Sequence, residues 1–192
     1  MAISINGNGT ITGISTGGLP DGCVDTDTLA NGAATQAKRT YANDEVIQTK
    51  YNSTTTQVQL TSNSAYQEVG FSTSITPTSS SSDIMVLCDL PWDLYTTSGG
   101  EAGIRFKLTR TISGTETTLY EDASGASTYN YSSSGATQVR ASRIINFKDT
   151  SISTTSAATY KVYCKPLNTS SNATKVTTNS TIGAMILMEI KA

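Results

Sequence analysis

The chain has 192 residues, a formal net charge of −2 and only 15% charged residues. This length fits one domain with an appendage, and so low a charge argues against a nucleic-acid partner held by neutralised phosphates. The sequence has no histidine, which excludes the commonest general base and every nucleophile that depends on a histidine base.

The N-terminal segment predicts a small hairpin. Residues 3–14 alternate apolar and polar side chains on either side of the tetrapeptide NGNG, and an Asn-Gly pair is a typical hairpin turn. A lone hairpin is only marginally stable in water. We therefore expect residues 1–20 to form a hairpin that needs a neighbour and serves as an anchor.

The next segment contains a near-repeat of ten residues, in which DGCVDTDTLA aligns with NGAATQAKRT. Each unit starts with a turn dipeptide and is too short to form a stable helix alone. The apolar side chains of the units make a thin stripe, which includes Val24, Leu29, Ala33 and Ala34. Such a stripe gains stability only when other chains bury it, so residues 21–55 are predicted to be a short oligomeric stalk or linker.

One further helix is predicted in this region, around residues 43–50 with Asn43 as its cap. From residue 56 onward the pattern predicts strands. Ile104, Phe106 and Leu108, for example, alternate with polar or charged residues. Eight or nine such strands, separated by turns, predict an all-β fold in which residues 56–192 form an antiparallel, jelly-roll-like β-sandwich.

Two of the predicted strands have unusual patterns. The run TQVRASRIINF has an irregular apolar register, which a β-bulge would explain. The last strand, TIGAMILMEI, is apolar on both faces until Glu189. A strand of this kind is expected at the centre of a sheet or at a subunit interface.

The cysteine pattern does not predict a metal site or a disulfide framework. The chain has three cysteines and no C-x-x-C spacing. Cys88 and Cys164 are expected on inward faces of two strands, as a disulfide beside Trp92 or as two buried free thiols. Trp92 follows Cys88 far more closely than the tryptophan follows the first cysteine in immunoglobulin-like domains, so free thiols are favoured.

The acidic residues suggest little chemistry. Asp21, Asp25 and Asp27 lack the ordered loop and bidentate glutamate of a calcium-binding EF-hand, so capping and turn roles are favoured over calcium. Glu121 and Asp122 are adjacent carboxylates, as in a glycosidase pair, but a solvated face is favoured. We predict no enzymatic activity, no cofactor and no metal.

Two predicted loops hold the candidate binding residues. Residues 90–101 contain Trp92, the only tryptophan, and Tyr95; residues 123–136 interleave Tyr129 and Tyr131 with Ser and Gly. Tyrosine among small polar residues is typical of recognition loops and suits stacking on sugar rings. For Trp92 a core position is favoured, and the tyrosine-containing loop is either a binding loop or a passive connector.

These motifs resemble short fibre-like appendage proteins of tailed bacteriophages of the marine and cyanobacterial type. The resemblance covers most of the chain and is carried by SINGNGTITGISTGGLPDG, by the ten-residue units and by the closing STIGAMILMEIKA. It implies a homotrimer that attaches through its N-terminus to tail, portal or capsid proteins of the virion. With two repeat units, the stalk is expected to be short.

Two functions follow from this resemblance. The first is a trimeric fibre or spike that displays the sandwich outward, for contact with a host cell-surface glycan. The second is a trimeric capsid-decoration protein that stabilises the phage head without binding a host. The N-terminal residues lack a secretory signal pattern and no apolar stretch is long enough to cross a membrane. We therefore expect assembly in the host cytoplasm, residence in the virion and no membrane insertion.

Overall fold

The structure, a computed structural model, describes residues 40–97, 100–122, 128–167, 174–177 and 181–192 in full, and only the backbone of residues 4–5, 11–12 and 173. The chain divides into two units, Met1–Thr40 and Tyr41–Ala192. In the first unit, β1 (Ser4–Ile5) and β2 (Ile11–Thr12) pair antiparallel. This confirms the predicted N-terminal hairpin. The four candidate stalk residues, Val24, Leu29, Ala33 and Ala34, lie outside the described part of the chain.

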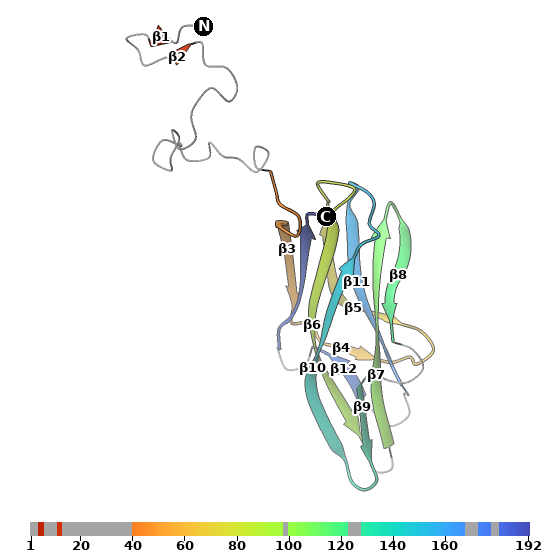
Figure 1. The fold of residues 1–192 in the computed structure, drawn as a ribbon. Helices are drawn as coiled ribbons and strands as arrows, with labels where there is room; N and C mark the ends of the chain where they lie inside the picture. The colour runs from red at the N-terminus through yellow and green to blue at the C-terminus, as the bar shows by residue number, and fades with distance from the viewer. Residues whose placement is uncertain are drawn as a thin grey trace. The chain divides into compact units, whose positions relative to one another are not determined.

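The second unit is a sandwich of two antiparallel sheets (Figure 1), which confirms the predicted fold class. The six-stranded sheet has the order β3-β13-β6-β12-β4, with β10 paired to β6. The five-stranded sheet has the order β5-β11-β7-β8, with β9 paired to β7. Both β10 and β13 pair with the first half of β6, so they lie along its two opposite edges.

The strands of the six-stranded sheet are β3 (Val46–Thr54), β4 (Val58–Leu60), β6 (Asp83–Thr96), β10 (Thr137–Asp149), β12 (Ala173–Val176) and β13 (Gly183–Ile190). Those of the five-stranded sheet are β5 (Gln67–Ile75), β7 (Gly100–Ile112), β8 (Thr115–Glu121), β9 (Thr128–Ser132) and β11 (Ala158–Pro166).

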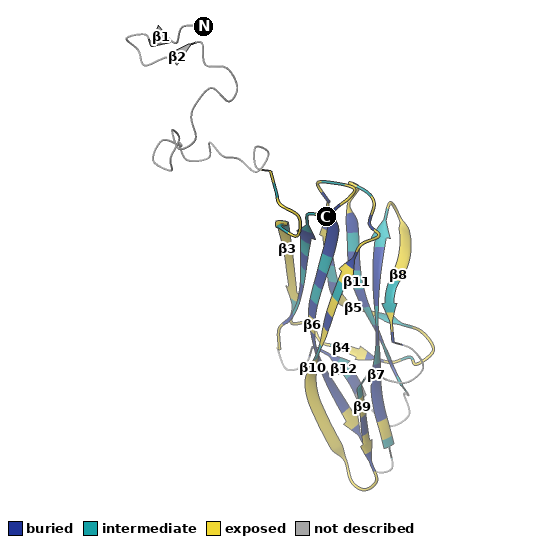
Figure 2. Cartoon of the chain, in the orientation of Figure 1, coloured by how far each residue is buried: buried dark blue, intermediate teal, exposed yellow. Residues whose placement is uncertain are grey.

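The core fills the space between the sheets, and its residues come from alternate positions of the long strands. In β11, for example, Tyr160, Val162 and Cys164 are fully buried while the residues between them are half-buried. Trp92 is 6% exposed and belongs to this core. Cys88 and Cys164 are buried and unbonded, as predicted. Burial alternates in the same way over residues 84–90 of β6 and 104–108 of β7 (Figure 2), whereas residues 90–94 and 108–110 are buried without interruption.

The helix predicted around residues 43–50 is wrong, because this stretch belongs to a strand. β3 pairs with β13 along its length, with Tyr51 opposite Ile186. The β-branched residues of β3 suit a pleated surface, and the free edge of β13 pairs with the backbone groups on one side of β3. The sandwich therefore begins well before residue 56, the boundary that the sequence suggested, and the compact unit starts at Tyr41.

The bulge predicted in residues 137–147 is also wrong. β10 pairs with β6 without any shift in register, with Ile145 opposite the inward-facing Cys88. Ile144 then points to the outer face, where it is 69% exposed. The irregular apolar pattern comes from this exposed isoleucine and not from an extra residue.

Glycine is required at two positions. The turn between β7 and β8 consists of Ser113 (φ 50°) and Gly114 (φ 84°), both left-handed, as a two-residue hairpin demands. At the start of β13, Gly183 lies against the ring of Phe71, and a Cβ at Gly183 would come within 2.2 Å of the Phe71 Cζ atom. β13 lies between β3 and β6, which confirms the central position predicted for the last strand.

The two ends of the sandwich differ. The chain enters next to the C-terminus. There the Asp44 N–H donates to the Lys191 carbonyl at 2.7 Å, and the Lys191 N–H donates to the Glu45 carbonyl. At the opposite end lie β9, the last residues of β6 and the turn into β10 (Figure 1). The chain entry and the β9 region are thus separated by the full length of the sheets.

Candidate functional site

The two candidate tyrosines lie on a strand and not in a loop. Tyr129 and Tyr131 occupy alternate positions of β9, and they are 51% and 56% exposed. The residues between and after them, Asn130 and Ser132, point inward and are buried. Because side chains at i and i+2 share one face of a strand, both rings project from the same outer surface.

The neighbouring strand β7 shapes the surface around these rings. Tyr131 lies opposite Glu101, and Tyr129 lies opposite Gly103, which places no side chain beside the ring. A hydrogen bond to the Glu101 carboxylate is the main cause that raises the pKa of the Tyr129 phenol. The surface therefore combines two aromatic rings with one carboxylate acceptor.

A polar network beneath β9 holds the strand in place. The Asn130 Nδ2 donates to the Thr137 Oγ1 at 3.2 Å, and the Thr137 and Thr96 hydroxyls are 2.7 Å apart. The Ser132 hydroxyl donates to the Gly135 carbonyl at 2.7 Å and closes the turn into β10. These contacts fix the backbone of β9, so the tyrosine rings are presented from a rigid support.

The structure separates the other two candidates from this pair. Trp92 is a core residue, and its indole nitrogen is buried with no hydrogen-bond partner among the described residues. Tyr95 is 38% exposed, but it lies on β6 of the other sheet, with buried residues before and after it. Tyr129 and Tyr131 are therefore brought together, and Tyr95 projects from the opposite face of the sandwich.

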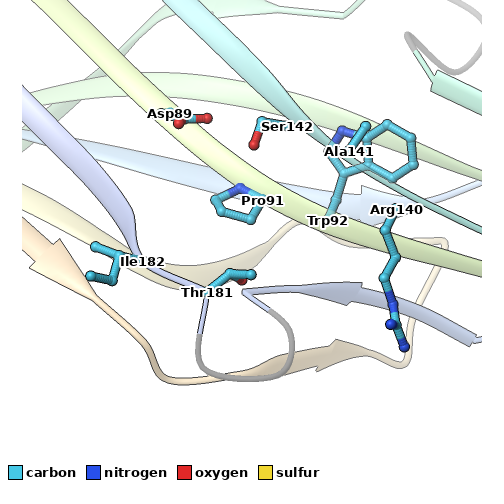
Figure 3. Close-up of a pocket in the computed structure, with 8 residues that line it drawn as sticks. All are labelled: Asp89, Pro91, Trp92, Arg140, Ala141, Ser142, Thr181 and Ile182. Atoms are coloured by element: carbon cyan, nitrogen blue, oxygen red, sulfur yellow. The ribbon is translucent and has the colours of Figure 1, made fainter.

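A hollow that the sequence did not indicate lies beside β6 and β10. It has a volume of about 440 Å³. Its lining residues, drawn in Figure 3, are Asp89, Pro91, Trp92, Arg140, Ala141, Ser142, Thr181 and Ile182. The Arg140 Nε donates to the Asp93 Oδ2 at 3.1 Å, which holds the guanidinium at the edge of the hollow. No motif marks these residues, because only strand pairing brings Arg140 next to β6.

The buried charged groups Arg110 and Asp149 form structural contacts with each other. The Arg110 Nη1 donates to both carboxylate oxygens of Asp149, at 2.9 and 2.7 Å, and the Tyr160 hydroxyl donates to the same group. Burial alone would raise the pKa of Asp149, but the hydrogen bonds from Tyr160, Arg110 and Ser151 together lower it. This cluster joins β7, β10 and β11 and has no free acid or base.

The solvated face predicted for Glu121 and Asp122 is wrong for Asp122. That carboxylate is buried, accepts a hydrogen bond from the Phe106 N–H at 2.8 Å and another from the Tyr120 hydroxyl. Asp122 therefore ties the end of β8 to β7. In the part of the chain that the structure describes, no group of three or more Cys, Asp or Glu residues is arranged to hold a metal ion. No helix within those residues is long and apolar enough to cross a membrane.

No protein-family model and no curated protein matches this chain. Among solved structures, the chain is similar to infectious bursal disease virus of the Gx strain, with 13% identity and a TM-score of 0.42 over 78% of this chain and 33% of that one. The VP2 subviral particle of the same virus gives 13% identity and a TM-score of 0.38, over 74% and 32% of the two chains. The chain thus spans about a third of the length of these viral chains.

Proposed function

We propose that the protein is a structural virion protein of a tailed bacteriophage. In this role it is a homotrimeric fibre or spike, attached by its N-terminal segment to other virion proteins and presenting the sandwich to the host surface. The family resemblance of the N-terminal hairpin, the ten-residue units and the closing strand supports the virion role. The proposed role requires no catalytic chemistry and no cofactor.

The observation that carries the display role is the separation of the two ends of the sandwich. The chain enters beside the C-terminus, and β9, the strand that carries the exposed Tyr129 and Tyr131, lies at the far end (Figure 1). A domain that is held at its entry end therefore offers these rings to whatever lies beyond the virion. Most large aromatic side chains are buried in folded domains, so two exposed rings on one strand face favour a binding surface.

The chemistry of this surface fits a glycan. Aromatic rings can lie against the apolar faces of sugar rings, and the Glu101 carboxylate can accept hydrogen bonds from sugar hydroxyls. One such contact is weak. A trimer presents it three times, and the effective concentration of the second and third sites strengthens attachment without any new contact.

The test is the double substitution Tyr129→Ala with Tyr131→Ala in the full chain, assembled into phage particles. We expect adsorption to host cells to fall about tenfold or more, because the loss in each copy is multiplied across the trimer. The melting temperature should change little, since the removed side chains are exposed. Tyr95→Ala is the matched control, because Tyr95 is an exposed tyrosine on the other face. Normal adsorption of the double variant would overturn the glycan role.

The second candidate is a trimeric capsid-decoration protein. The observation that favours it is the row of apolar outward residues on β13 (Ala184, Ile186 and Met188), a surface that a capsid shell could cover. Copy number separates the two functions. Decoration places many copies on the head at symmetry positions, whereas a fibre or spike is present in few copies at the tail. A cryo-electron microscopy map of virions that carry a tagged chain decides between them.

A further inference from the structure

The outer face of the five-stranded sheet carries two positive charges side by side. Arg105 on β7 and Lys165 on β11 are outward residues of their strands, and the strand register places them directly opposite each other. Like charges at directly opposite positions of an antiparallel pair repel each other and cost stability. An anion that binds between the two side chains removes this repulsion, so the pair favours a negatively charged ligand.

No carboxylate of the described residues neutralises the two cations. Neither Arg105 nor Lys165 takes part in an ion pair with any residue that the structure describes. The Arg105 Nε atom is buried and has no hydrogen-bond partner among those residues. In the sequence, residues 123–127, after β8, and residues 168–172, after β11, include no Asp or Glu. Neither segment can therefore supply the missing carboxylate.

An aromatic ring holds the lysine without removing its charge. The Lys165 Nζ lies 4.5 Å from the centre of the Tyr66 ring, and the Lys107 Nζ lies 5.0 Å from the same centre. Burial raises the pKa of the Tyr66 phenol, and the nearby charge of Arg105 partly opposes this effect. A ring positions an ammonium group through its quadrupole and carries no net charge. The three cations around Tyr66 are therefore oriented but keep their charge.

The cation pair continues the surface of the exposed tyrosines. β9 lies beside the first residues of β7 (Figure 1), and Tyr129 is opposite Gly103. Gly103 and Arg105 are successive outward positions of β7, and such positions are roughly 7 Å apart along a strand. Gly103 has no side chain that would separate the Tyr129 ring from Arg105. One extended ligand can therefore contact the tyrosines and the cation pair together.

Carboxylates beside this surface disfavour a densely charged polyanion. Glu101 lies opposite Tyr131, and the exposed Glu121 lies opposite Lys107. Both carboxylates repel a ligand that carries a charge on every unit, such as a nucleic acid, but they accept hydrogen bonds from hydroxyl groups. A sugar chain with occasional anionic groups offers hydroxyls to the carboxylates, ring faces to the tyrosines and a negative charge to the cation pair.

We propose that this surface binds an anionic glycan, whose sulfate or carboxylate group lies between Arg105 and Lys165. The planar guanidinium donates two parallel hydrogen bonds to such an anion, and the lysine adds a second positive charge. The inference rests on the proposed glycan-binding function and names the chemical class of the glycan. It adds Arg105 and Lys165 to the two tyrosines as residues that determine specificity.

The test is calorimetric titration of the full chain with three polymers that share one backbone: dextran, dextran sulfate and carboxymethyl dextran. We expect binding of a charged polymer and at least tenfold weaker binding of dextran, and the preferred polymer identifies the anion. Arg105→Gln and Lys165→Gln should each weaken this binding about tenfold, the effect of losing one charge-assisted contact. Lys50→Gln is the matched control, because Lys50 is exposed on β3 of the other sheet, and it should change nothing.

A thermal melt of the same variants distinguishes a binding role from a structural one. Removing one of two like charges relieves their repulsion, so both Arg105→Gln and Lys165→Gln should melt at the wild-type temperature or slightly above it. A clear fall in melting temperature would show that the fold itself compensates these charges, which overturns the inference.

The binding outcomes separate this inference from the proposed function. Equal binding of dextran and the charged polymers, with no effect of the glutamine variants, overturns the anionic class and leaves a neutral glycan on the tyrosines. A chain that binds neither charged polymer also overturns it, while adsorption of the Tyr129→Ala, Tyr131→Ala double variant still decides the display role. Binding of an oligothymidylate as tight as that of the charged dextrans would identify a general polyanion surface and overturn the glycan.

Discussion

The two outer faces of the sandwich follow the same strand geometry but carry different chemistry. On the five-stranded sheet, outward positions hold lysines, glutamates and tyrosines in contact with each other. The Lys107 Nζ lies 4.8 Å from the centre of the Tyr163 ring and 5.0 Å from that of Tyr66. On the six-stranded sheet, the corresponding positions of β13 hold alanine, isoleucine and methionine.

This difference separates a polar face, which carries paired charges, from a face on which β13 presents apolar side chains, called the apolar face below. The polar face satisfies several of its groups internally: Lys161 pairs with Glu68 at 3.1 Å, and the Tyr163 hydroxyl donates to Glu116 at 3.0 Å. Burial and the Glu116 hydrogen bond raise the pKa of Tyr163 to about 12, so this phenol stays protonated and keeps donating at neutral pH. On the apolar face, the half-buried Ala184, Ile186 and Met188 have no polar groups to satisfy, and the exposed Asp89 of β6 lies opposite Ala184.

The largest loss of stability is expected from Gly183→Ala. This substitution disrupts β13, the strand whose outward residues distinguish the two faces. The new Cβ would lie 2.2 Å from the Phe71 Cζ, and Phe71 is a buried core residue, 2% exposed, so the ring or the strand would have to shift. We expect a loss of about 3 kcal/mol of unfolding free energy, measured by chemical denaturation. Gly135→Ala is the control: there the Cβ meets nothing within 4 Å, and only the positive φ of 74° costs about 1 kcal/mol. Equal losses in the two variants would contradict this packing.

The second prediction concerns how stability depends on pH through two buried carboxylates, Asp149 and Glu189. The pKa values of Asp149 and Glu189 are lowered in the folded protein, because hydrogen bonds to the carboxylates outweigh the effect of burial. A lowered pKa means that the carboxylate contributes stability above its unfolded value, and that this contribution is lost as the pH falls through the folded value. The usual values are 3.8 for Asp149 and 4.5 for Glu189. The melting temperature should therefore be level near neutral pH and fall below about pH 4.

The variant Asp149→Asn separates this contribution from the rest. It leaves the Arg110 guanidinium without its charged partner, at a site where Arg110 and Asp149 are 8% and 2% exposed. We expect a loss of about 3 kcal/mol at pH 7 and a shallower acid transition. An unchanged acid transition in this variant would show that other carboxylates control it.

The smallest effect is expected on the polar face. Lys161→Ala removes one partly exposed ion pair, with side-chain exposures of 29% for Lys161 and 45% for Glu68. Such pairs contribute less than about 1 kcal/mol and are screened by salt. We expect a barely measurable change in stability and no change in the sedimentation of the chain. A loss of clearly more than about 1 kcal/mol would contradict this small contribution.

Period-two alternation was sufficient to predict most of the sandwich. Ile104, Phe106 and Leu108 alternate with polar residues, and Tyr160 and Val162 do the same, so their inward positions could be assigned without coordinates. The pairing of residues 4–5 with residues 11–12 was also predicted, because the Asn-Gly pairs between them in the sequence favour a hairpin. The absence of histidine limited the possible chemistry before any fold was known.

The pairing of distant segments could not be derived from the sequence. Residues 46–54 contain β-branched residues that suit a strand, but the helix cap at Asn43 favoured a helix, and the pairing with β13 decides between the two. The exposed Ile144 looked like a slipped register until its pairing opposite Asp89 placed it on the outer face. Tyr129 and Tyr131 were noticed from composition alone, whereas their shared face and the contact with Glu101 depend on the pairing of β9 with β7.

The sequence by itself determined the all-β class, the inward residues of the long strands and the absence of histidine chemistry, because these depend on residue type and on a spacing of two along the chain. Only the tertiary structure decided which apolar residues are covered. Ile186 and Leu187 are neighbours of similar hydrophobicity, yet Leu187 is fully buried and Ile186 lies on the outer face. The physical reason is that the local sequence of a strand with two apolar faces does not indicate which face packs against the opposing sheet. In β13 that choice is made by the close fit of Gly183 against Phe71 and by the buried hydrogen bonds of Glu189 to Gln48 and Thr78.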